Sequence, residues 1–531
     1  MRLKSGSVTP EAFASRAVSR DLYFFEKTLF AVAKGFMTPT SIFCFVRAQA
    51  RPAATAVFPT PVLVPVMKTP CMEILLEVQK KQHLIDLDLI NADKEFVWHP
   101  YTQMRDWAKW NNNVIVKGDG FYLVDNQGRR YLDCTASMWC NVWGYSKNEI
   151  VQAMIDQLEN LPHSTLFGLA NAPSINLAKR LITLAAGMDK VFFTDNGSTA
   201  IEVAMKIALQ YWHNKGKDKK KEFISLDHGY HGDTTGAMSV GYIENFFRAY
   251  RPLLFNVHRV PSPILYGSRF TNEKDLVEWC LEKTEKTIKR HMDQCAALVM
   301  ESGAQIAGGA IIFPKGYQKR IAKLCRDNGI LLILDEIATG FGRLGNFVEY
   351  LAQKSQPDIV CFGKALTGGY FPLAVTLVTR RIFDAFLGKY HNNKHLYHGH
   401  TFTGHPVGCA AAVANIENYQ NHNLIQQIKA SSEYIASRLP EFYKSPIVAD
   451  IRHKGLLLGI ELAKNNKPII VLKNKEIINY FIMQQALKMG VHMRPLRNVM
   501  LLIPPLGIGR IDLEKLINSQ LLLVRKIEKL S

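Results

Sequence analysis

The sequence predicts an α/β fold with a large, mostly parallel β-sheet and a smaller α+β domain. From about residue 93 onward, short β-branched runs alternate with longer segments of helical period. Several of these runs show little or no polar alternation, which is typical of strands buried on both faces of a sheet. After about Pro406 the helical segments lengthen and the strands become fewer, which favours a separate C-terminal domain.

The elements expected for the large sheet follow one another in a regular order. The strands are predicted at residues 190–194, 222–226, 296–300, 329–334, 358–362 and 374–378. Helical patterns lie between them, most clearly over residues 198–212 and 315–328. A strand followed by a helix and then by another buried strand is the unit from which parallel sheets are built.

Four segments are therefore expected along the chain. They are an atypical extension over 1–70, an N-terminal segment of the small domain over 93–140, a large cofactor-binding domain over 141–405, and the C-terminal small domain over 406–531. The extension is rich in Ala, Arg, Ser, Thr and Pro, and no clear period runs through it. Its basic, acid-poor composition fits a transit peptide. A start at Met67 or Met72, with a flexible or mis-assigned segment before it, is the favoured alternative because acidic residues interrupt the extension.

Composition excludes several classes of protein. The chain has 531 residues, 47% of them hydrophobic, and no uncharged apolar run of about 18 residues, so no membrane span is expected. The net charge of +19 includes a lysine-rich run at 215–221 that lacks interleaved aromatic residues, which favours a solvated loop over a nucleic-acid site. Nine cysteines form no Cys-x-x-Cys pair, which favours reduced thiols and a cytoplasmic location.

Five predicted strands in succession end in polar or small residues. In open α/β sheets, ligands bind outside the carboxyl ends of the strands, so these residues are expected to meet at one edge. The segments that follow the strands are Asp195 to Thr199, Asp227 to Asp233, Glu301, Asp335-Glu336, and Gly363-Lys364.

Each of these strand ends has a place in one chemical scheme. Gly197 and Ser198 open a helix, whose free N–H groups and dipole favour an anion such as phosphate. A buried Asp335 suits a pyridinium nitrogen, and Lys364 among apolar neighbours suits a Schiff base. Tyr230 offers a ring for stacking. Taken singly, each has a plainer reading, because helix starts and strand-end acids are common; their combination carries the interpretation.

Two other motifs would indicate different cofactors, a dinucleotide and a metal ion. Residues 340–345 match the dinucleotide fingerprint Gly-x-Gly-x-x-Gly, but the match starts several residues after its strand and opens no clear amphipathic helix. A histidine cluster at 391, 395, 398 and 400 lies in an Asn-rich stretch typical of a loop, with no Cys or carboxylate close by. Neither a nicotinamide cofactor nor a metal ion is therefore predicted, and a nucleotide triphosphatase is disfavoured because no Gly-x-x-x-x-Gly-Lys-Ser/Thr occurs.

Longer motifs resemble a known family. Three motifs resemble those of the class III aminotransferases. They are Asp335-Glu-Ile-Ala-Thr-Gly-Phe-Gly-Arg343, Phe362-Gly-Lys364-Ala-Leu-Thr-Gly-Gly and Gly229-Tyr-His-Gly-Asp233. Within that class, three further motifs resemble the branch that acts on 8-amino-7-oxononanoate in biotin biosynthesis. They are Trp98-His-Pro-Tyr101-Thr-Gln-Met, His398-Gly-His-Thr401-Phe and Met493-Arg494-Pro-Leu. The resemblance implies pyridoxal 5′-phosphate as cofactor, the large-domain fold of the aspartate aminotransferase type, and a homodimer with shared active sites.

The resemblance also implies roles for single residues. Lys364 would carry the cofactor as a Schiff base, Asp335 would bind the pyridinium nitrogen, and Tyr230 would stack on the ring and face the substrate. The phosphate and the rest of the cofactor would be held by Gly197, Ser198, His400 and Thr401, with Thr401 reaching across from the partner subunit. The substrate would be lined by Tyr101, Trp139, Gly399 and Arg494, with Arg494 pairing with a carboxylate.

The amino donor and the acceptor remain open at this point. The branch that uses S-adenosylmethionine as donor commonly has two adjacent tryptophans where this chain has Met138-Trp139. Met138-Trp-Cys-Asn-Val, with His163-Ser-Thr later, is more similar to the branch that uses lysine. Alternatives to the 8-amino-7-oxononanoate reaction are another ω-amino-acid or diamine transaminase, and a non-enzymatic regulator with the same fold.

Overall fold

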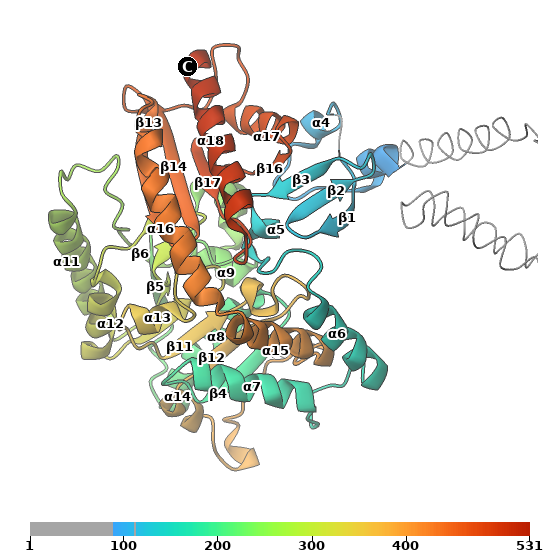
Figure 1. Cartoon of the computed structure of the whole chain (residues 1–531). Coiled ribbons are helices and arrows are strands. Elements are labelled where there is room, and N and C mark those ends of the chain that lie inside the picture. The colour runs from blue at the N-terminus through green and yellow to red at the C-terminus, as the bar shows by residue number, and fades with distance from the viewer. Residues whose placement is uncertain (1–88, 111–112) are drawn as a thin grey trace, which may run out of the picture. The chain divides into compact units, whose positions relative to one another are not determined.

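A seven-stranded mixed β-sheet forms the centre of the molecule in the computed structural model, which describes residues 89–110 and 113–531 (Figure 1). In spatial order its strands are β4 (Lys190–Thr194), β12 (Ala374–Val378), β11 (Ile359–Phe362), β10 (Leu331–Asp335), β7 (Cys295–Glu301), β5 (Glu222–Leu226) and β6 (His258–Val260). Only β12 runs against its neighbours, so the carboxyl ends of the other strands meet at one edge.

All six strands predicted for this sheet are present. Three of them, β4, β5 and β12, have the predicted bounds, and the other three differ by one or two residues at an end. β6 was not predicted, because three residues are too few for a periodic signal. The mostly parallel α/β architecture is confirmed.

The alternation of side chains along the strands divides the apolar core between the two faces of the sheet. Leu298, Leu332 and Leu334 belong to the larger cluster, together with residues of α7 (Ala172–Leu184), α11 (Glu273–His291) and α12 (Tyr317–Asp327). Val299 and Ile333, on the opposite face, pack with α8 (Gly197–Asn214). Burial of both faces explains why these strands read as unbroken apolar runs.

Within the described part of the chain, three further sheets lie outside the large one. β1 (Ile115–Asp119), β2 (Tyr122–Asp125) and β3 (Arg130–Asp133) form an antiparallel meander, which is completed by β16 (Val491–His492) parallel to β3. The second sheet contains β13 (Val448–Lys454), β14 (Leu457–Lys464), β15 (Lys467–Pro468) and β17 (Val499–Leu502). The third is the short pair β8 (Ala304–Gln305) and β9 (Ile311–Ile312). The first of these sheets thus joins segments from both halves of the chain.

The remaining helices surround these sheets (Figure 1). The longer ones are α6 (Asn148–Asn160), α15 (Pro406–Asn421), α16 (Leu424–Phe442), α17 (Ile478–Lys488) and α18 (Arg510–Leu530). The short ones are α4 (Met104–Trp107), α5 (Ala136–Trp139), α9 (Thr235–Val240), α10 (Glu244–Phe247), α13 (Glu349–Ala352), α14 (Arg380–Asp384) and the 3-10 turns η1 (Arg248–Leu253), η2 (Lys364–Thr367) and η3 (Tyr390–Asn392). Residues 89–96 are also helical. α15 packs on α6 and α7, so the element after the expected boundary at 405 contacts the elements before it.

Several sequence predictions are tested only in part by the structure. The extension over 1–70 and its candidate starts lie outside the described residues. The described residues, 89–110 and 113–531, belong to one compact unit, and its subdivision at 140 and 405 stays a prediction. The seven cysteines within 89–110 and 113–531 are all free thiols. Among the helices that the structure describes, none combines the length and the apolar character that a membrane span requires.

Candidate active site

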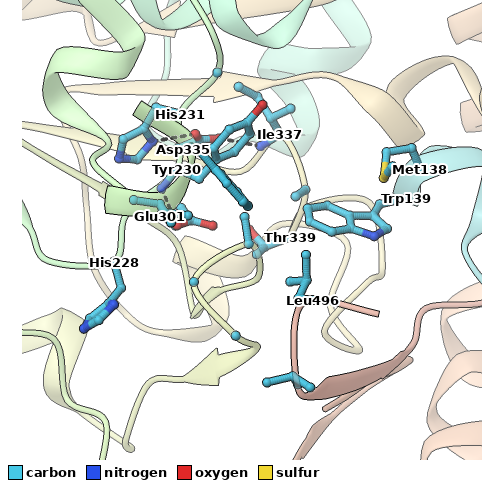
Figure 2. Close-up of a pocket in the computed structure, with 18 of the residues that line it drawn as sticks. Met138, Trp139, His228, Tyr230, His231, Glu301, Asp335, Ile337, Thr339 and Leu496 are labelled. Carbon is cyan, nitrogen blue, oxygen red and sulfur yellow. Dashed lines mark hydrogen bonds and ion pairs between the residues drawn. The ribbon is translucent and has the colours of Figure 1, made fainter. Parts of the chain in front are cut away.

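A cavity of about 2070 Å³ opens at the carboxyl ends of the parallel strands. Eight residues predicted for the site line it: Tyr101, Trp139, Gly197, Ser198, Tyr230, Asp335, Lys364 and Arg494. They come from segments more than 390 residues apart, between Tyr101 and Arg494. Figure 2 shows Trp139 and Tyr230 pointing into the cavity from opposite sides, with Asp335 and His231 behind Tyr230.

Asp335, the last residue of β10, is held rigidly at the floor of the cavity. Its Oδ2 accepts a hydrogen bond from Nδ1 of His231 over 2.7 Å, and its Oδ1 accepts one from the backbone N–H of Ile337 over 2.9 Å. Both side chains of the Asp335–His231 pair are buried. Because a carboxylate only accepts, His231 carries the proton on Nδ1 in this pair. The arrangement fixes a buried acceptor in the lining of the cavity.

Lys364 stands two residues beyond β11 with a left-handed backbone, at φ 46°. Its Nζ lies 4.9 Å from the centre of the Trp139 ring. Burial lowers the pKa of the Lys364 amine, while the carboxylates of Asp335 and Glu301 act in the opposite direction. A lowered pKa increases the share of neutral amine, which is the nucleophilic form needed to bond a carbonyl carbon.

The amino end of α8 forms another wall of the cavity. Asn196 caps the helix by accepting the N–H of Thr199 over 3.0 Å, and the two residues before Thr199, Gly197 and Ser198, line the cavity. A Cβ on Gly197 would lie 2.7 Å from Cγ2 of Ile337, so only glycine allows this approach without a shift. Thr234 donates its backbone N–H to Oγ of Ser198 over 3.1 Å and orients that hydroxyl. The helix end is thus a close-fitting site for an anion.

Two tyrosines converge on one carboxylate at the substrate side. Tyr101 donates to Oδ1 of Asp233 over 2.7 Å, and Tyr230 donates to Oδ2 over 3.1 Å. Burial, with Asp233 as a further cause, raises the pKa of both phenols, so they stay protonated and donate. Arg494 donates from Nη2 to the backbone oxygen of Tyr101 over 3.2 Å, and burial lowers its pKa. The remaining N–H groups of that guanidinium have no protein acceptor among the described residues.

The turn Ala136–Trp139 has an unusual backbone. All four residues have positive φ, at 47°, 48°, 66° and 77°, although none is glycine. Two i to i−4 hydrogen bonds, from the N–H of Trp139 to Thr135 O and of Cys140 to Ala136 O, make it one turn of left-handed helix. Such a conformation costs roughly 1–2 kcal/mol per non-glycine residue. The turn therefore holds strain at the point where Trp139 enters the cavity.

His231 and Glu301 are site residues to which the sequence analysis gave no role. Glu301 ends β7 directly beside Asp335 of β10, and its two oxygens accept the N–H groups of Tyr230 and Ile306. Burial raises the pKa of the Glu301 carboxyl well above its usual range, and the neighbouring Asp335 adds to the effect. Both residues lie in the strand-end segments already noted, but their partners are 104 and 71 residues away in sequence.

Gly399, His400 and Thr401 do not line the cavity of the single chain. Gly399 faces the Phe167 ring, and a Cβ there would lie 2.2 Å from it. His400 stands with Nδ1 4.0 Å from Oδ2 of Asp195, and Thr401 is exposed. The expectation for Thr401 concerns the partner subunit, so it stays a prediction.

The competing motifs have structural places of their own. Residues 340–345 form a series of turns, and no helix opens at the third glycine. The histidines at 391–400 do not gather with a carboxylate into a possible metal group within the described chain. A group that does gather is Glu222, His258 and His291, remote from the cavity lining. Its two imidazoles stack at 3.7 Å and 25°, and Nε2 of His258 is already paired with Oε2 of Glu222 over 2.7 Å, so we assign no metal to it.

Comparison with known proteins decides the family. The family profile described as "Aminotransferase class-III" matches residues 106–521. The chain belongs to the class III aminotransferases. It is 40% identical over 438 residues to the adenosylmethionine-8-amino-7-oxononanoate aminotransferase of Methanocaldococcus jannaschii, covering 80% of this chain and 95% of that protein. It is 38% identical to the enzyme of that name from Staphylococcus aureus, with 81% and 95% covered.

Solved structures of class III aminotransferases share the fold. The M. jannaschii crystal structure has a TM-score of 0.77 at 38% identity and covers 83% of this chain and 99% of its own. An ω-transaminase from Pseudomonas jessenii, solved in complex with PMP, has a TM-score of 0.79 at 29% identity, with 83% and 98% covered. The predicted fold of the aspartate aminotransferase type is confirmed.

Class III aminotransferases depend on pyridoxal 5′-phosphate, and the donor set of the cavity fits that group. A close-fitting helix end offers N–H groups to a phosphate, a buried acid offers an acceptor to a ring nitrogen, and an amine of lowered pKa lines the same cavity. These are the three chemical requirements of the cofactor, and one cavity brings them together.

Proposed function

We propose that this chain aminates 8-amino-7-oxononanoate to 7,8-diaminononanoate, a step of biotin biosynthesis. The observation that carries the proposal is the near-complete alignment with relatives named for this acceptor, 95% of the M. jannaschii protein at 40% identity. Arg494 gives the proposal a physical basis, because it lines the same cavity as Lys364 and has N–H groups without a protein acceptor among the described residues. A guanidinium is well suited to the carboxylate of an amino-oxononanoate.

The proposed cofactor site has three parts. Lys364 attaches the cofactor covalently, Asp335 keeps its ring nitrogen protonated, and Gly197 with Ser198 binds its phosphate. When bound, the pyridinium ring withdraws electrons from the substrate carbon and so lowers the barrier to proton removal. His231 supports this arrangement by fixing the carboxylate of Asp335, and the ring of Tyr230, which lines the cavity, would stack on the bound cofactor.

Proton transfer is assigned to the Nζ of Lys364. With the cofactor bound, Nζ would be the group placed to take a proton from the substrate carbon and to return it, so Lys364 would act as the acid–base group. Burial keeps part of the amine neutral, and the indole of Trp139 limits where Nζ can move. A neutral amine is a better base at ordinary pH than an ammonium of unshifted pKa.

Substrate binding is assigned to other residues that line the cavity. Arg494 binds the carboxylate of the acceptor, and Tyr101 with Trp139 contacts its carbon chain. Asp233, oriented by two tyrosine hydroxyls, provides a negative charge for a substrate ammonium. Arg494 for a carboxylate and Asp233 for an ammonium group would together match a substrate that carries both groups.

The amino donor and the assembly belong to the same proposal. S-adenosylmethionine or L-lysine is the donor, and Met138 beside Trp139 is the departure that keeps lysine in view. The enzyme is expected to act as a cytoplasmic homodimer without nucleic-acid or membrane partners. His400, Thr401 and Gly399 would complete the active site across the subunit boundary, which accounts for their absence from the cavity lining of one chain.

Half-reaction spectra test the proposal. Purified protein loaded with cofactor is mixed with S-adenosylmethionine or L-lysine, and conversion to the amine form is followed by absorbance. The amine form is then mixed with 8-amino-7-oxononanoate or with simple ω-amino-acid and aldehyde acceptors. Preferential reoxidation by 8-amino-7-oxononanoate is expected. Equal or faster reaction with the simple acceptors would favour an ω-transaminase, the activity named for the P. jessenii structure.

A further inference from the structure

The left-handed turn Ala136–Trp139 has no sequence signal, because none of its residues favours positive φ. It ends at the residue whose ring lies over the catalytic amine, 4.9 Å from Nζ of Lys364. Figure 2 shows Trp139 entering the cavity toward Thr339 and Tyr230, with Met138 next to it. Backbone strain at such a place persists only if neighbouring groups impose it.

Asp133 is the group that holds the start of the turn by hydrogen bonds. It is fully buried at the end of β3, and its carboxylate accepts four hydrogen bonds. Oδ1 accepts the backbone N–H and the hydroxyl of Thr135, both over 2.8 Å. Oδ2 accepts the N–H of Ser137 over 2.7 Å and the hydroxyl of Tyr145 over 2.6 Å. Two of these donors are backbone groups at the start of the turn, so the carboxylate fixes its path directly.

Tyr145 fastens the turn from its outer side. Its hydroxyl donates to Asp133 and accepts a hydrogen bond from Oγ of Ser137 over 2.8 Å. Burial, with Asp133 as a further cause, raises the pKa of this phenol, so the proton stays in place to make the bond. Gly118 allows the ring to approach, since a Cβ there would lie 2.2 Å from the Tyr145 Cβ.

The inner end of the turn is anchored by packing. The Trp139 side chain is 8% exposed and belongs to an apolar cluster with Leu344, Leu457 and Val499. Met138, one residue earlier, is 47% exposed at the cavity. A shift of the turn would therefore move both side chains, one over the lysine and one toward the substrate entrance.

We propose that Asp133 is a positioning residue, and that the strained left-handed turn it clamps is the device that sets Trp139 over Lys364 and Met138 at the substrate entrance. Asp133 does not touch the reacting atoms. It acts through the turn, and the strain is the consequence of placing two large side chains where an unstrained turn would not. The inference rests on the proposed placement of the reaction at Lys364.

A pair of substitutions separates strain from hydrogen bonding. Ser137→Ala and Ser137→Gly both remove the hydroxyl that bonds Tyr145, but only glycine is at ease at φ 48°. Ser137→Gly is expected to unfold at a temperature about 1–2 °C higher than Ser137→Ala, because the strain is relieved. It is expected to exchange the amide protons of residues 137–141 faster and to have a kcat/KM about tenfold lower, mostly through KM.

The matched control lies outside the site. Lys354 also has a left-handed backbone, at φ 51°, and does not line the cavity. Lys354→Gly should unfold at a temperature higher than Lys354→Ala by the same amount as in the Ser137 pair, and the two Lys354 variants should have the same kcat and KM. Equal unfolding temperatures for the Ser137 pair would show that the turn is unstrained and overturn the proposal. A thermal gain with unaltered KM and exchange would equally overturn it, by removing the link from strain to position.

Asp133→Asn tests the clamp itself. An amide keeps the size of the side chain but cannot accept all four hydrogen bonds, so faster exchange at 137–141 and a raised KM are expected. Wild-type exchange and KM in a folded Asp133→Asn protein would remove Asp133 from the role. If the variant does not fold, the Ser137 pair decides. Failure of the wild-type protein to use 8-amino-7-oxononanoate would count against the proposed function alone, because the unfolding and exchange comparisons do not depend on the acceptor.

Discussion

His231 donates a hydrogen bond from Nδ1 to Oδ2 of Asp335 over 2.7 Å, and both side chains are buried. The bond joins the loop after β5 to the end of β10, 104 residues later. Together with the N–H of Ile337 it occupies one position on each carboxylate oxygen, which leaves the acid no freedom to rotate. The cofactor's ring nitrogen would thus meet a carboxylate of fixed orientation.

Asp335→Asn should retain the cofactor but lose the first half-reaction by several orders of magnitude. A neutral amide cannot keep the ring nitrogen protonated, so the electron withdrawal that lowers the barrier is lost. The measurement is stopped-flow absorbance with the preferred donor at saturating cofactor. Near-normal turnover would remove Asp335 from this role.

His231→Asn should slow the same half-reaction by about tenfold, a smaller loss than that of Asp335→Asn. The substitution leaves the acid in place but removes the ring that orients it. The absorbance maximum of the bound cofactor and its pH dependence should shift with the variant, because the partner of the ring nitrogen has changed. An unchanged spectrum with a slower rate would indicate that His231 serves folding only.

Lys364→Ala should abolish covalent attachment of the cofactor. After borohydride reduction, mass spectrometry of wild-type protein is expected to find the adduct on the peptide that contains Lys364 and to find none in the variant. Lys206→Ala is a suitable control, because its amine bonds Tyr397 O and His398 outside the cavity. An adduct on a different lysine in the wild-type protein would show the assignment to be wrong.

How much of this fold the sequence predicts depends on whether each element is determined by neighbouring residues or by residues far away in the chain. The central strands are predicted to within two residues because burial on both faces leaves unbroken apolar runs, a local pattern. β16 has two residues and pairs with β3 from the other end of the chain, so no local sequence pattern predicts it. The left-handed turn before Cys140 has no recognisable pattern either, because none of its residues favours a positive φ. The bonds that hold it to the Asp133 carboxylate come from Ser137 and Tyr145, only four and twelve residues later, so distance in sequence is not what hides it.

The candidate site divides in the same way. Lys364, Asp335 and Gly197 follow strands directly, so strand prediction brings them to the cavity. His231 and Glu301 lie in equivalent places, but their function depends on which strand lies beside which, and the order of strands is not readable from periodicity. Residues 399–401 await a second subunit, which a single sequence does not place.

Stability should fall as pH rises from about 4.5 to about 8, because of Glu336. Burial raises the pKa of this carboxyl from 4.5 to about 8, although the N–H groups of Glu349 and Tyr350 act against the shift. In that interval the folded protein holds a proton that the unfolded chain has released, so each pH unit favours unfolding by up to about 1.4 kcal/mol. Urea titrations between pH 5 and pH 8 measure the slope.

Glu336→Gln should flatten this dependence. The amide does not titrate, so the difference in unfolding free energy between variant and wild type should grow in the variant's favour as pH rises through the interval. The comparison concerns the slope, because the amide loses one of the two accepted backbone bonds and shifts the whole curve. Parallel curves for the two proteins would place the titrating group elsewhere.

Arg494→Ala should weaken use of 8-amino-7-oxononanoate by about 10- to 100-fold, because a partly dry guanidinium–carboxylate pair is among the stronger recognition contacts. Arg494→Lys should not restore it fully, since an ammonium cannot make two parallel bonds. Arg320→Ala, which removes a surface arginine paired with Glu278, is the control. The two half-reactions are measured separately. Loss in both means that the arginine also reads the donor carboxylate, and loss in the second alone means that the donor is held elsewhere. An unaltered acceptor half-reaction would end the claim that Arg494 reads this substrate, and would leave a simple diamine or ω-amino acid as the better candidate.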